Sequence, residues 1–263
     1  METAQTKVKI VSHNKLKNNY WYLEFESGLI AKNACPGQFV EVKVSDRMYP
    51  LLRRPLSIHS VNKAKVKLIY EVIGPGTQIL SKRNRGDFLD VIGPLGNGFK
   101  YSRITKKSDQ EKTILVAGGM GVAPLVFLAE KIKLNKPLVL IGARKKDQIL
   151  CLPEFKTLGC KVIIATDDGS LGFKGKVTEL LKEILSEAGQ SNKPKNIYAC
   201  GPHFMLKAVN GISCEHNIAS QLSLETHMAC GFGACLGCVV STKSGYKRVC
   251  KDGPVFSGKE LTW

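Results

Sequence analysis

Residues 113–124 read TILVAGGMGVAP, and this stretch indicates the fold of the second half of the chain. Thr113–Ala117 is a short apolar run that suits a strand buried on both faces. A glycine turn follows it. Pro124–Leu134 then has the apolar spacing of a helix, and Leu138–Ile141 is a second apolar strand. Strand, turn, helix and strand in this order predict a βαβ unit.

The same rhythm continues downstream of this unit. Strands are expected at Val162–Ala165 and Asn196–Ala199, with a helix over Lys176–Leu185. We therefore expect an α/β domain over residues 110–220, with a parallel sheet covered by helices on both faces.

Upstream of residue 105 the pattern changes to short alternating strands separated by glycine or proline turns. They are expected at Val8–Ser12, Tyr20–Glu26, Gln38–Val44, Val66–Ile73 and Phe88–Ile92. This pattern is typical of an antiparallel barrel or sandwich. Polar residues 106–112 mark the boundary, which predicts a first domain over 1–105. The remaining 221–263 form a small segment that needs a metal or a neighbour to be stable.

The composition limits the classes of partner. The formal net charge is +17, which raises the question of nucleic-acid or membrane-surface binding. The basic residues are spread along the whole chain and alternate with apolar ones, so we expect no nucleic-acid partner. The longest apolar run, Ile114–Ala129, is too short and too interrupted to span a bilayer. The first residues do not resemble a secretory signal, so we expect a cytoplasmic protein with reduced cysteines and no membrane association.

Four of the nine cysteines have the spacing C-x4-C-x2-C-x11-C. They are Cys230, Cys235, Cys238 and Cys250. This is the plant-type ferredoxin spacing for a 2Fe-2S cluster. The interleaved glycines 231, 233 and 237 permit the tight backbone that wraps such a cluster. A structural zinc site is the alternative, but zinc ribbons usually pair two C-x2-C knuckles and this segment has one.

Two loops of the α/β half are candidates for nucleotide binding. Gly118, Gly119 and Gly121 lie between a strand and a helix, where backbone N–H groups and the positive helix end face a pyrophosphate. Such a turn also occurs merely to allow close packing. Cys200-Gly201-Pro202 ends a predicted strand, where side chains meet ligands in open α/β sheets.

Two features of the barrel half are weaker candidates. Arg54 and Ser57 lie close together in a run that starts a strand, where they suit a phosphate and a heterocycle edge. Gly76 and Thr77 follow a turn and begin a helix, which suits a second phosphate contact. A basic turn and a strand serine without function are the alternative.

Taken in order, these motifs resemble the ferredoxin reductase superfamily over nearly the whole chain. The cysteine run, together with residues 93–99 and 246–256, is similar to the electron-transfer subunits of NAD-dependent (type B) dihydroorotate dehydrogenases. The resemblance implies a chain that passes electrons through a 2Fe-2S cluster and FAD to NAD+. It also implies a partner, an FMN-containing catalytic subunit that oxidises dihydroorotate in pyrimidine biosynthesis, in a heterotetramer of two copies of each subunit. A related NAD(P)H-ferredoxin or sulfide dehydrogenase type reductase is the alternative.

The resemblance also implies roles for individual residues. Those implied for FAD are Arg54, Pro55, Leu56, Ser57, Ile69, Tyr70, Glu71, Gly76 and Thr77. Those expected at the nicotinamide nucleotide are Gly118, Gly119, Gly121, Cys200, Gly201 and Pro202. The superfamily often has an aromatic residue where Leu56 stands, so flavin stacking is expected from elsewhere, with Tyr70 as the candidate. Many relatives have arginine where Glu71 stands, so that side chain is not expected to contact phosphate.

Nucleotide preference and partner surface complete the expectations. The basic run Arg144-Lys145-Lys146 suits the 2′-phosphate of NADP, whereas Asp167 and Asp168 after the next strand would repel it. The resemblance favours NAD(H). Apolar residues around the cysteines are expected to contact the partner, with packing inside the loop as the alternative. They are Phe232, Leu236 and Val239.

Overall fold

The computed structural model describes residues 2–102, 112–189 and 193–263. The chain divides into two compact units, each built from segments that are separate in sequence. Unit 1 contains residues 1–98, 226–240 and 247–254. Unit 2 contains residues 99–225, 241–246 and 255–263. The cysteine-rich segment therefore contributes to both units. The predicted boundary near residues 105–110 lies outside the described residues, and the three-domain division remains a prediction.

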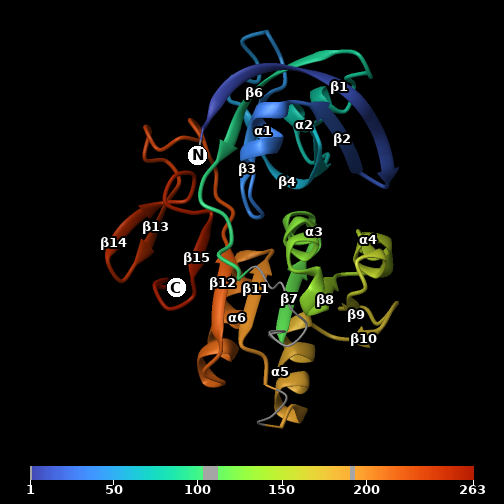
Figure 1. The fold of residues 1–263 in the computed structure, drawn as a ribbon, viewed down its shortest axis with the longest axis vertical. Helices are drawn as coiled ribbons and strands as arrows, with labels where there is room; N and C mark the ends of the chain where they lie inside the picture. Colours follow the sequence, from blue (N-terminus) through green and yellow to red (C-terminus); the bar gives the residue numbers. More distant parts are fainter. Residues whose placement is uncertain (1, 103–111, 190–192) are drawn as a thin grey trace. The chain divides into compact units, whose positions relative to one another are not determined.

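Unit 1 is built around a closed antiparallel barrel with the strand order β1-β2-β5-β4-β3-β6 (Figure 1). Its strands are β1 (Ala4–Lys17), β2 (Tyr20–Glu26), β3 (Phe39–Lys43), β4 (Arg54–Asn62), β5 (Lys65–Glu71) and β6 (Phe88–Leu95). Two short helices, α1 (Gly28–Asn33) and α2 (Pro75–Leu80), interrupt the strands. Alternating apolar residues fill the interior, as Val40 and Val42 of β3 do with no exposed surface. The predicted antiparallel barrel is confirmed.

Unit 2 contains a seven-stranded sheet with the order β10-β9-β8-β7-β11-β12-β15. Its strands are β7 (Thr113–Gly118), β8 (Leu138–Ala143), β9 (Lys161–Thr166), β10 (Phe173–Lys174), β11 (Asn196–Cys200), β12 (Ala219–Ser223) and β15 (Val255–Ser257). All neighbours pair in parallel except β12 and β15. The predicted parallel sheet is confirmed, and the end of the chain adds its antiparallel edge.

Helices form two layers on this sheet. They are α3 (Val122–Lys131), α4 (Leu152–Thr157), α5 (Val177–Glu187) and α6 (His203–Glu215). Helix α3 contacts α4, and α5 contacts α6, so each pair forms one layer. The 3-10 helices η2 (Gly119–Gly121), η3 (Lys133–Asn135) and η4 (Lys146–Gln148) lie in the connections. Helix α3 begins at Val122, two residues before the predicted start, because the glycine turn itself winds into η2.

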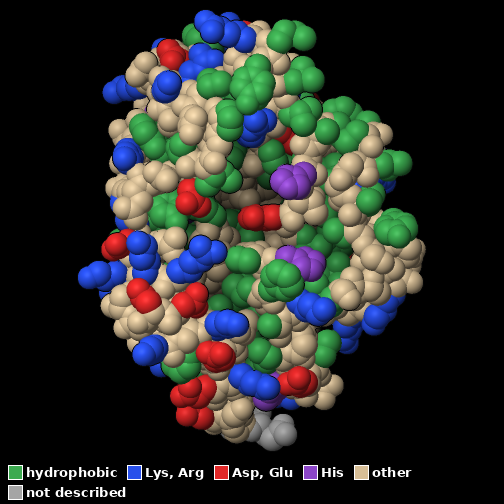
Figure 2. Space-filling model, turned by 180° about the vertical axis from the view of Figure 1, so that it is seen from behind, with side chains coloured by type: hydrophobic (Ala, Val, Ile, Leu, Met, Phe, Trp, Pro, Cys, Tyr) green, Lys and Arg blue, Asp and Glu red, His purple; other side chains and the backbone are tan. Residues whose placement is uncertain are grey.

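The remaining strands, β13 (Val239–Thr242) and β14 (Gly245–Arg248), pair as a two-stranded sheet between the third and fourth clustered cysteines. All nine cysteines are free thiols. No helix in the described part of the chain is long and apolar enough to cross a membrane. On the face drawn in Figure 2, basic side chains are interspersed with acidic ones and form no continuous patch.

Candidate functional site

The four clustered cysteines all belong to unit 1, the unit that contains the barrel. Their exposure differs. Cys235 is exposed and Cys230 is half-buried, whereas Cys238 and Cys250 are buried. Between the first two cysteines, Gly231 (φ +77°) and Gly233 (φ +91°) adopt left-handed backbone that side chains disfavour. The interleaved glycines thus permit the loop that the spacing predicts.

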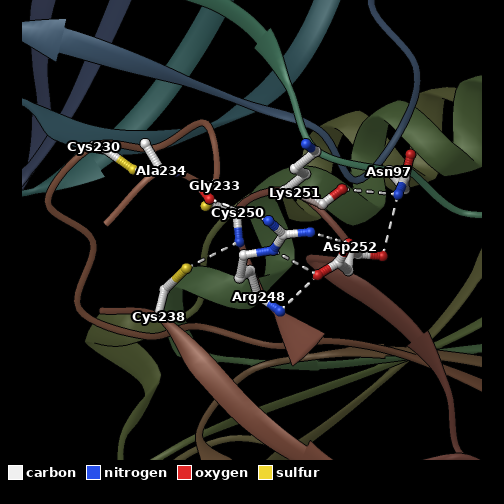
Figure 3. A network of polar contacts seen from close by, with 9 residues as sticks. All are labelled: Asn97, Cys230, Gly233, Ala234, Cys238, Arg248, Cys250, Lys251 and Asp252. Carbon is white, nitrogen blue, oxygen red and sulfur yellow. Dashed lines mark hydrogen bonds and ion pairs between the residues drawn. The ribbon is translucent and has the colours of Figure 1, made fainter. Parts of the chain in front are cut away.

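Backbone N–H groups point at the cysteine sulfur atoms. Ala234 donates to the Sγ of Cys230 at 3.3 Å, and Gly237 donates to the Sγ of Cys235 at 3.5 Å. Deeper in the segment, the N–H of Cys250 donates to the Sγ of Cys238 at 3.4 Å (Figure 3). Such bonds stabilise thiolate sulfur, and hydrogen bonds to sulfur tune iron–sulfur clusters. Four sulfur donors with this backbone environment fit a cluster held by thiolates.

The two ends of the cysteine set differ in acidity. Burial tends to raise the pKa of Cys230, but N–H groups of Cys235 and Phe232 outweigh it and lower that pKa to about 6. Burial and the neighbouring Cys238 raise the pKa of Cys250 to about 12. The low pKa of Cys230 favours its thiolate form, whereas the Cys250 thiol has to release its proton when metal binds.

Arg248 connects the two parts of the cysteine segment. Its Nε and Nη2 donate to the two carboxylate oxygens of Asp252 at 3.0 and 3.2 Å. Its Nη1 donates to the carbonyl oxygen of Gly233 at 3.2 Å, as Figure 3 shows. Arg248 therefore joins the turn that carries Cys250 to the loop that carries Cys230 and Cys235.

Asn97 fastens the cysteine segment to the end of the barrel sheet. Its Nδ2 donates to the carbonyl oxygens of Lys251 at 3.0 Å and Asp252 at 3.1 Å (Figure 3). Its backbone N–H donates to the carbonyl oxygen of Gly253. The sequence analysis predicted no role for Asn97, Arg248 or Asp252. No spacing rule identifies a side chain that forms hydrogen bonds with the backbone of another segment.

Glu41 was also missed, and it lies beneath the cysteine loop. The alternation in β3 placed it opposite the apolar face, yet it has no exposed surface. The position that a Cβ of Gly231 would take lies 2.6 Å from its Oε1. Burial raises the pKa of Glu41 to about 7, although Arg53 and Arg54 lower it, and Cys230 adds to the rise. The charged face of β3 is covered at this point by the cysteine loop.

The barrel brings two of the predicted flavin motifs together. The Arg54 guanidinium lies directly against Gly76, so a Cβ at position 76 would overlap its Nε. The same guanidinium donates to the carbonyl oxygen of Leu52 at 2.6 Å. An arginine held over the first turn of α2 is suited to a phosphate group. A glycine at position 76 is what permits this approach.

The other predicted flavin residues have different surroundings. The Thr77 hydroxyl donates to the carbonyl oxygen of Gly74 at 3.1 Å and accepts from its N–H at 3.3 Å, so it closes the turn. Tyr70 is only 2% exposed, and its hydroxyl lies 2.8 Å from the Nε2 of His13. This geometry does not favour the stacking of Tyr70 on a flavin. Pro55, Ser57 and Glu71 are half-buried, whereas Leu56 and Ile69 are buried.

In unit 2, the glycine turn and the Cys200-Gly201-Pro202 loop meet at the carboxyl ends of the paired strands β7 and β11. A Cβ on Gly121 would overlap the carbonyl oxygen of Cys200, and one on Gly118 would lie 2.8 Å from Pro202. The strand order reverses between β7 and β11, which is where open α/β sheets bind nucleotides. Gly119 has φ +53°, and no atom lies within 4 Å of the position that a Cβ would take there.

Cys200 itself is a buried thiol, 1% exposed, and burial raises its pKa, with Glu225 adding to the rise. It is therefore a neutral side chain beside the nucleotide loop and not a reactive thiolate. The residues predicted to set the preference for NAD or NADP follow strands β8 and β9. Asp167 and Asp168 donate their N–H groups to the carbonyl oxygens of Ala143 and Arg144, and the side chains of Asp167, Asp168 and Arg144 are exposed.

Comparison with known families gives a domain description for two segments of the chain. Residues 225–262 match the model of the iron-sulfur cluster binding domain of dihydroorotate dehydrogenase B. Residues 115–211 match that of the oxidoreductase NAD-binding domain. The electron transfer subunit of dihydroorotate dehydrogenase B (NAD(+)) from Desulforamulus reducens is 41% identical, over 97% of each chain. The subunit from Caldanaerobacter subterraneus subsp. tengcongensis is 36% identical, again over 97% of each.

The chain belongs to this family of electron transfer subunits. The resemblance inferred from the motifs is thereby confirmed, and the chain is a component of an NAD-dependent oxidoreductase. The iron–sulfur and NAD-binding domains, together with the reductase fold, support the predicted cofactor set of FAD, a 2Fe-2S cluster and NAD.

Solved structures show the same fold. A structure of an NADH-dependent reduced ferredoxin-NADP oxidoreductase is 30% identical, with a TM-score of 0.82 over 97% of this chain and 90% of that one. A ferredoxin NADP+ reductase from Neisseria gonorrhoeae is 16% identical, with a TM-score of 0.66 over 81% of this chain and 91% of that one. The second likeness is one of fold alone.

Proposed function

We propose that this chain carries electrons between an FMN-containing dihydroorotate dehydrogenase catalytic subunit and NAD+, through a 2Fe-2S cluster and FAD, in pyrimidine biosynthesis. One observation supports this most: the four cysteines, with N–H groups directed at their sulfur atoms, are built onto the same barrel that holds Arg54 over Gly76. A cluster and a flavin site on one body suit single-electron transfer between them.

The cysteines and the barrel have separate tasks in this proposal. Cys230, Cys235, Cys238 and Cys250 ligate the cluster. Arg54 pairs with the FAD pyrophosphate, and Gly76 leaves room for that arginine. Ser57, which is half-buried on β4, is the residue that we assign to the reactive edge of the flavin. FAD, when bound, exchanges electron pairs with the nicotinamide and single electrons with the cluster.

The α/β unit positions the nicotinamide nucleotide. Backbone N–H groups of Gly119 and Gly121, at the start of α3, are suited to the pyrophosphate. The buried Cys200 thiol and Gly201 shape the floor where the strand order reverses. Pro202 packs against Gly118 and holds the two loops together.

The partner side of the proposal rests on exposed apolar residues beside the ligands. Phe232 is 53% exposed, Leu236 60% and Val239 42%. Exposed apolar side chains close in sequence to the cluster ligands are candidates for contact with a partner. We assign them to contact with the catalytic subunit, in an assembly with two copies of each chain. Localisation in the cytoplasm is part of the same proposal.

Co-expression with the catalytic subunit tests the assignment. The complex is expected to hold iron, acid-labile sulfide, FAD and FMN, and to reduce NAD+ with dihydroorotate. The chain by itself is expected to reduce artificial acceptors with NADH and to leave dihydroorotate unoxidised. Oxidation of dihydroorotate by the isolated, FMN-free chain would contradict the division of labour. Native mass spectrometry of the complex tests the two-plus-two stoichiometry.

A related ferredoxin-type reductase subunit is the second candidate. The likeness to the NADH-dependent reduced ferredoxin-NADP oxidoreductase structure, over nearly the whole chain, is the observation in its favour. The two functions differ in the partner that is needed. Electron exchange with ferredoxin in the absence of the dihydroorotate-oxidising subunit would favour this second function.

A further inference from the structure

The loops that follow β8 and β9 leave the sheet next to each other. Ala143 and Thr166, the last residues of these strands, are partners in the parallel pairing. The N–H of Asp167 donates to the carbonyl oxygen of Ala143 at 3.1 Å. The N–H of Asp168 donates to the carbonyl oxygen of Arg144 at 3.2 Å. The pairing thus continues into both loops, at the carboxyl edge where open α/β sheets bind nucleotides.

One side chain joins the two loops. The N–H of Lys146, the first residue of η4, donates to the Oγ of Ser170 at 2.8 Å. These residues are 24 positions apart, so this bond links separate loops and is not part of a local turn. The N–H of Ser170 donates to the Oδ1 of Asp168 at 2.9 Å. Ser170 therefore fastens the loop after β9 both to the loop after β8 and to a carboxylate of its own loop.

The turn that contains Ser170 is closed by other groups. Thr166 has no exposed surface, and its hydroxyl donates to the carbonyl oxygen of Leu171 at 2.9 Å and accepts from the N–H of Leu171 at 3.0 Å. The N–H of Gly169 donates to the carbonyl oxygen of Thr166 at 3.0 Å. Loss of the Ser170 hydroxyl would therefore free the two loops from each other and leave the turn itself closed.

The loop after β9 presents groups that suit a ribose. Asp167, Asp168 and Ser170 are all exposed. Hydrogen bonds from the side chain and N–H of Ser170 lower the pKa of Asp168 and occupy its carboxylate. The Asp167 carboxylate forms no hydrogen bond or ion pair with the described part of the chain. It is therefore available to accept hydrogen bonds from ribose hydroxyls, as an acidic residue does in dinucleotide sites.

The strand order indicates which half of the nucleotide lies here. Strands β8 and β9 lie on one side of β7, and β11 lies on the other. A dinucleotide with its pyrophosphate at the start of α3 thus extends one nucleoside toward each side. The acidic residue of such sites binds the ribose of the adenosine, so we assign the adenosine half to the side of β8 and β9.

We propose that Ser170 is a positioning residue for the adenosine half of the nicotinamide nucleotide: it fastens the loop after β9 to the loop after β8 and so holds the Asp167 carboxylate in place for the ribose hydroxyls. The inference rests on the nucleotide site proposed for the α/β unit. It assigns Ser170 no part in binding the nicotinamide half, which makes the role separable from general damage to the site.

Binding of ADP-ribose to the purified complex, measured by isothermal titration calorimetry, tests this role. Ser170→Ala removes the acceptor for the Lys146 N–H and is expected to weaken ADP-ribose binding about three- to tenfold, the range for one hydrogen bond. Ser170→Thr keeps a hydroxyl and should bind ADP-ribose as the wild type does. Ser186→Ala, which removes an exposed hydroxyl from α5, is the control and should change nothing.

Steady-state kinetics with an artificial acceptor separate the two halves of the nucleotide. S170A should raise the KM for NADH by the same factor and leave kcat unchanged. With reduced nicotinamide mononucleotide, which lacks the adenosine half, both constants should equal those of the wild type.

Three results would overturn the proposal. The first is unchanged ADP-ribose binding in S170A, and the second is equal weakening in S170A and S170T. The third is an equal rise in KM for NADH and for reduced nicotinamide mononucleotide. A wild type that binds no ADP-ribose would refute the nucleotide site itself, and the role of Ser170 with it.

Discussion

The guanidinium of Arg248 donates to the carbonyl oxygen of Gly233 at 3.2 Å while it is held by the Asp252 carboxylate (Figure 3). The turn that presents Cys250 and the loop that presents Cys230 are separate in sequence, and this side chain joins them. Their relative position is therefore fixed by charge-assisted hydrogen bonds as well as by metal coordination.

Arg248→Ala is expected to loosen the cluster without removing a ligand. Hydrogen bonds to charged groups contribute about 1.5–3 kcal/mol, so iron should be released to a chelator about 10- to 100-fold faster than from the wild type. The measurement is the loss of visible absorbance in the presence of the chelator. Lys243→Ala removes an exposed cation from the same segment and should leave the rate unchanged. Equal rates for both variants would contradict the role of Arg248.

The four-cysteine ligand set predicts which thiols matter. Cys250→Ser should abolish or strongly change the cluster spectrum, because the buried inner sulfur is lost. Cys214→Ser, on the exposed surface of α6, should leave it intact. Absorption and electron paramagnetic resonance of the purified variants provide the measurement. A normal cluster in Cys250→Ser together with its loss in Cys214→Ser would show that the fourth ligand is wrong.

The flavin proposal predicts two flavin-poor variants. Arg54→Ala removes the group that pairs with the pyrophosphate, and FAD affinity should fall about 10- to 100-fold. Gly76→Ala should act similarly, because its Cβ would overlap the Arg54 guanidinium and displace it. FAD released per chain after purification is the readout. Arg85→Ala, an exposed arginine of the same barrel, is the control. Stoichiometric FAD in Arg54→Ala would refute the assignment.

Much of the fold could be predicted because strands and helices leave local signals. Strand β2 occupies Tyr20–Glu26, the range expected from alternation alone. The apolar run at Thr113 forms a fully buried strand between two parallel neighbours. The cysteine spacing was specific because one short loop carries three of the four sulfur atoms. Each of these signals lies within a single short segment.

The contacts that build the site could not be predicted in the same way. Glu41 belongs to a strand whose period is clear, but the period does not say that the cysteine loop covers its polar face. Asn97 bonds carbonyl oxygens near Cys250, and every residue type has such a carbonyl. Tyr70 lies on an apolar face, where its hydroxyl meets His13 from β1. These relations join segments far apart in the chain.

His13 gives the barrel a predictable response to acid. The carbonyl oxygen of Arg83, 2.7 Å from Nδ1, only accepts, so Nδ1 carries the proton and Nε2 accepts from the Tyr70 hydroxyl. Burial lowers the pKa of His13, although the Arg83 carbonyl and Asp87 raise it. The unfolded chain then binds more protons than the folded one, and stability is lost as the pH falls through about 6.5.

Thermal unfolding of the wild type and His13→Gln at pH 7.5 and 5.5 measures this effect. The wild type should lose more of its melting temperature on acidification than the variant, because glutamine does not titrate. Since both proteins carry the same remaining groups, the difference between the two losses isolates His13. An equal loss in the two proteins would contradict the predicted linkage.

Nucleotide preference is expected to depend on the loop after β9. Asp167 and Asp168 are exposed there, next to the end of β8 that carries Arg144. A carboxylate near the adenosine ribose repels the 2′-phosphate of NADP, so the wild type should have the higher kcat/KM with NADH.

Asp167→Asn should reduce the ratio of kcat/KM with NADH to kcat/KM with NADPH about tenfold, because roughly 1.4 kcal/mol of repulsion is removed. Glu215→Gln, which neutralises an exposed carboxylate at the end of α6, is the control and should leave the ratio unchanged. Steady-state kinetics with both nucleotides decide the matter. A higher kcat/KM of the wild type with NADPH would overturn the preference and favour the ferredoxin-type reductase.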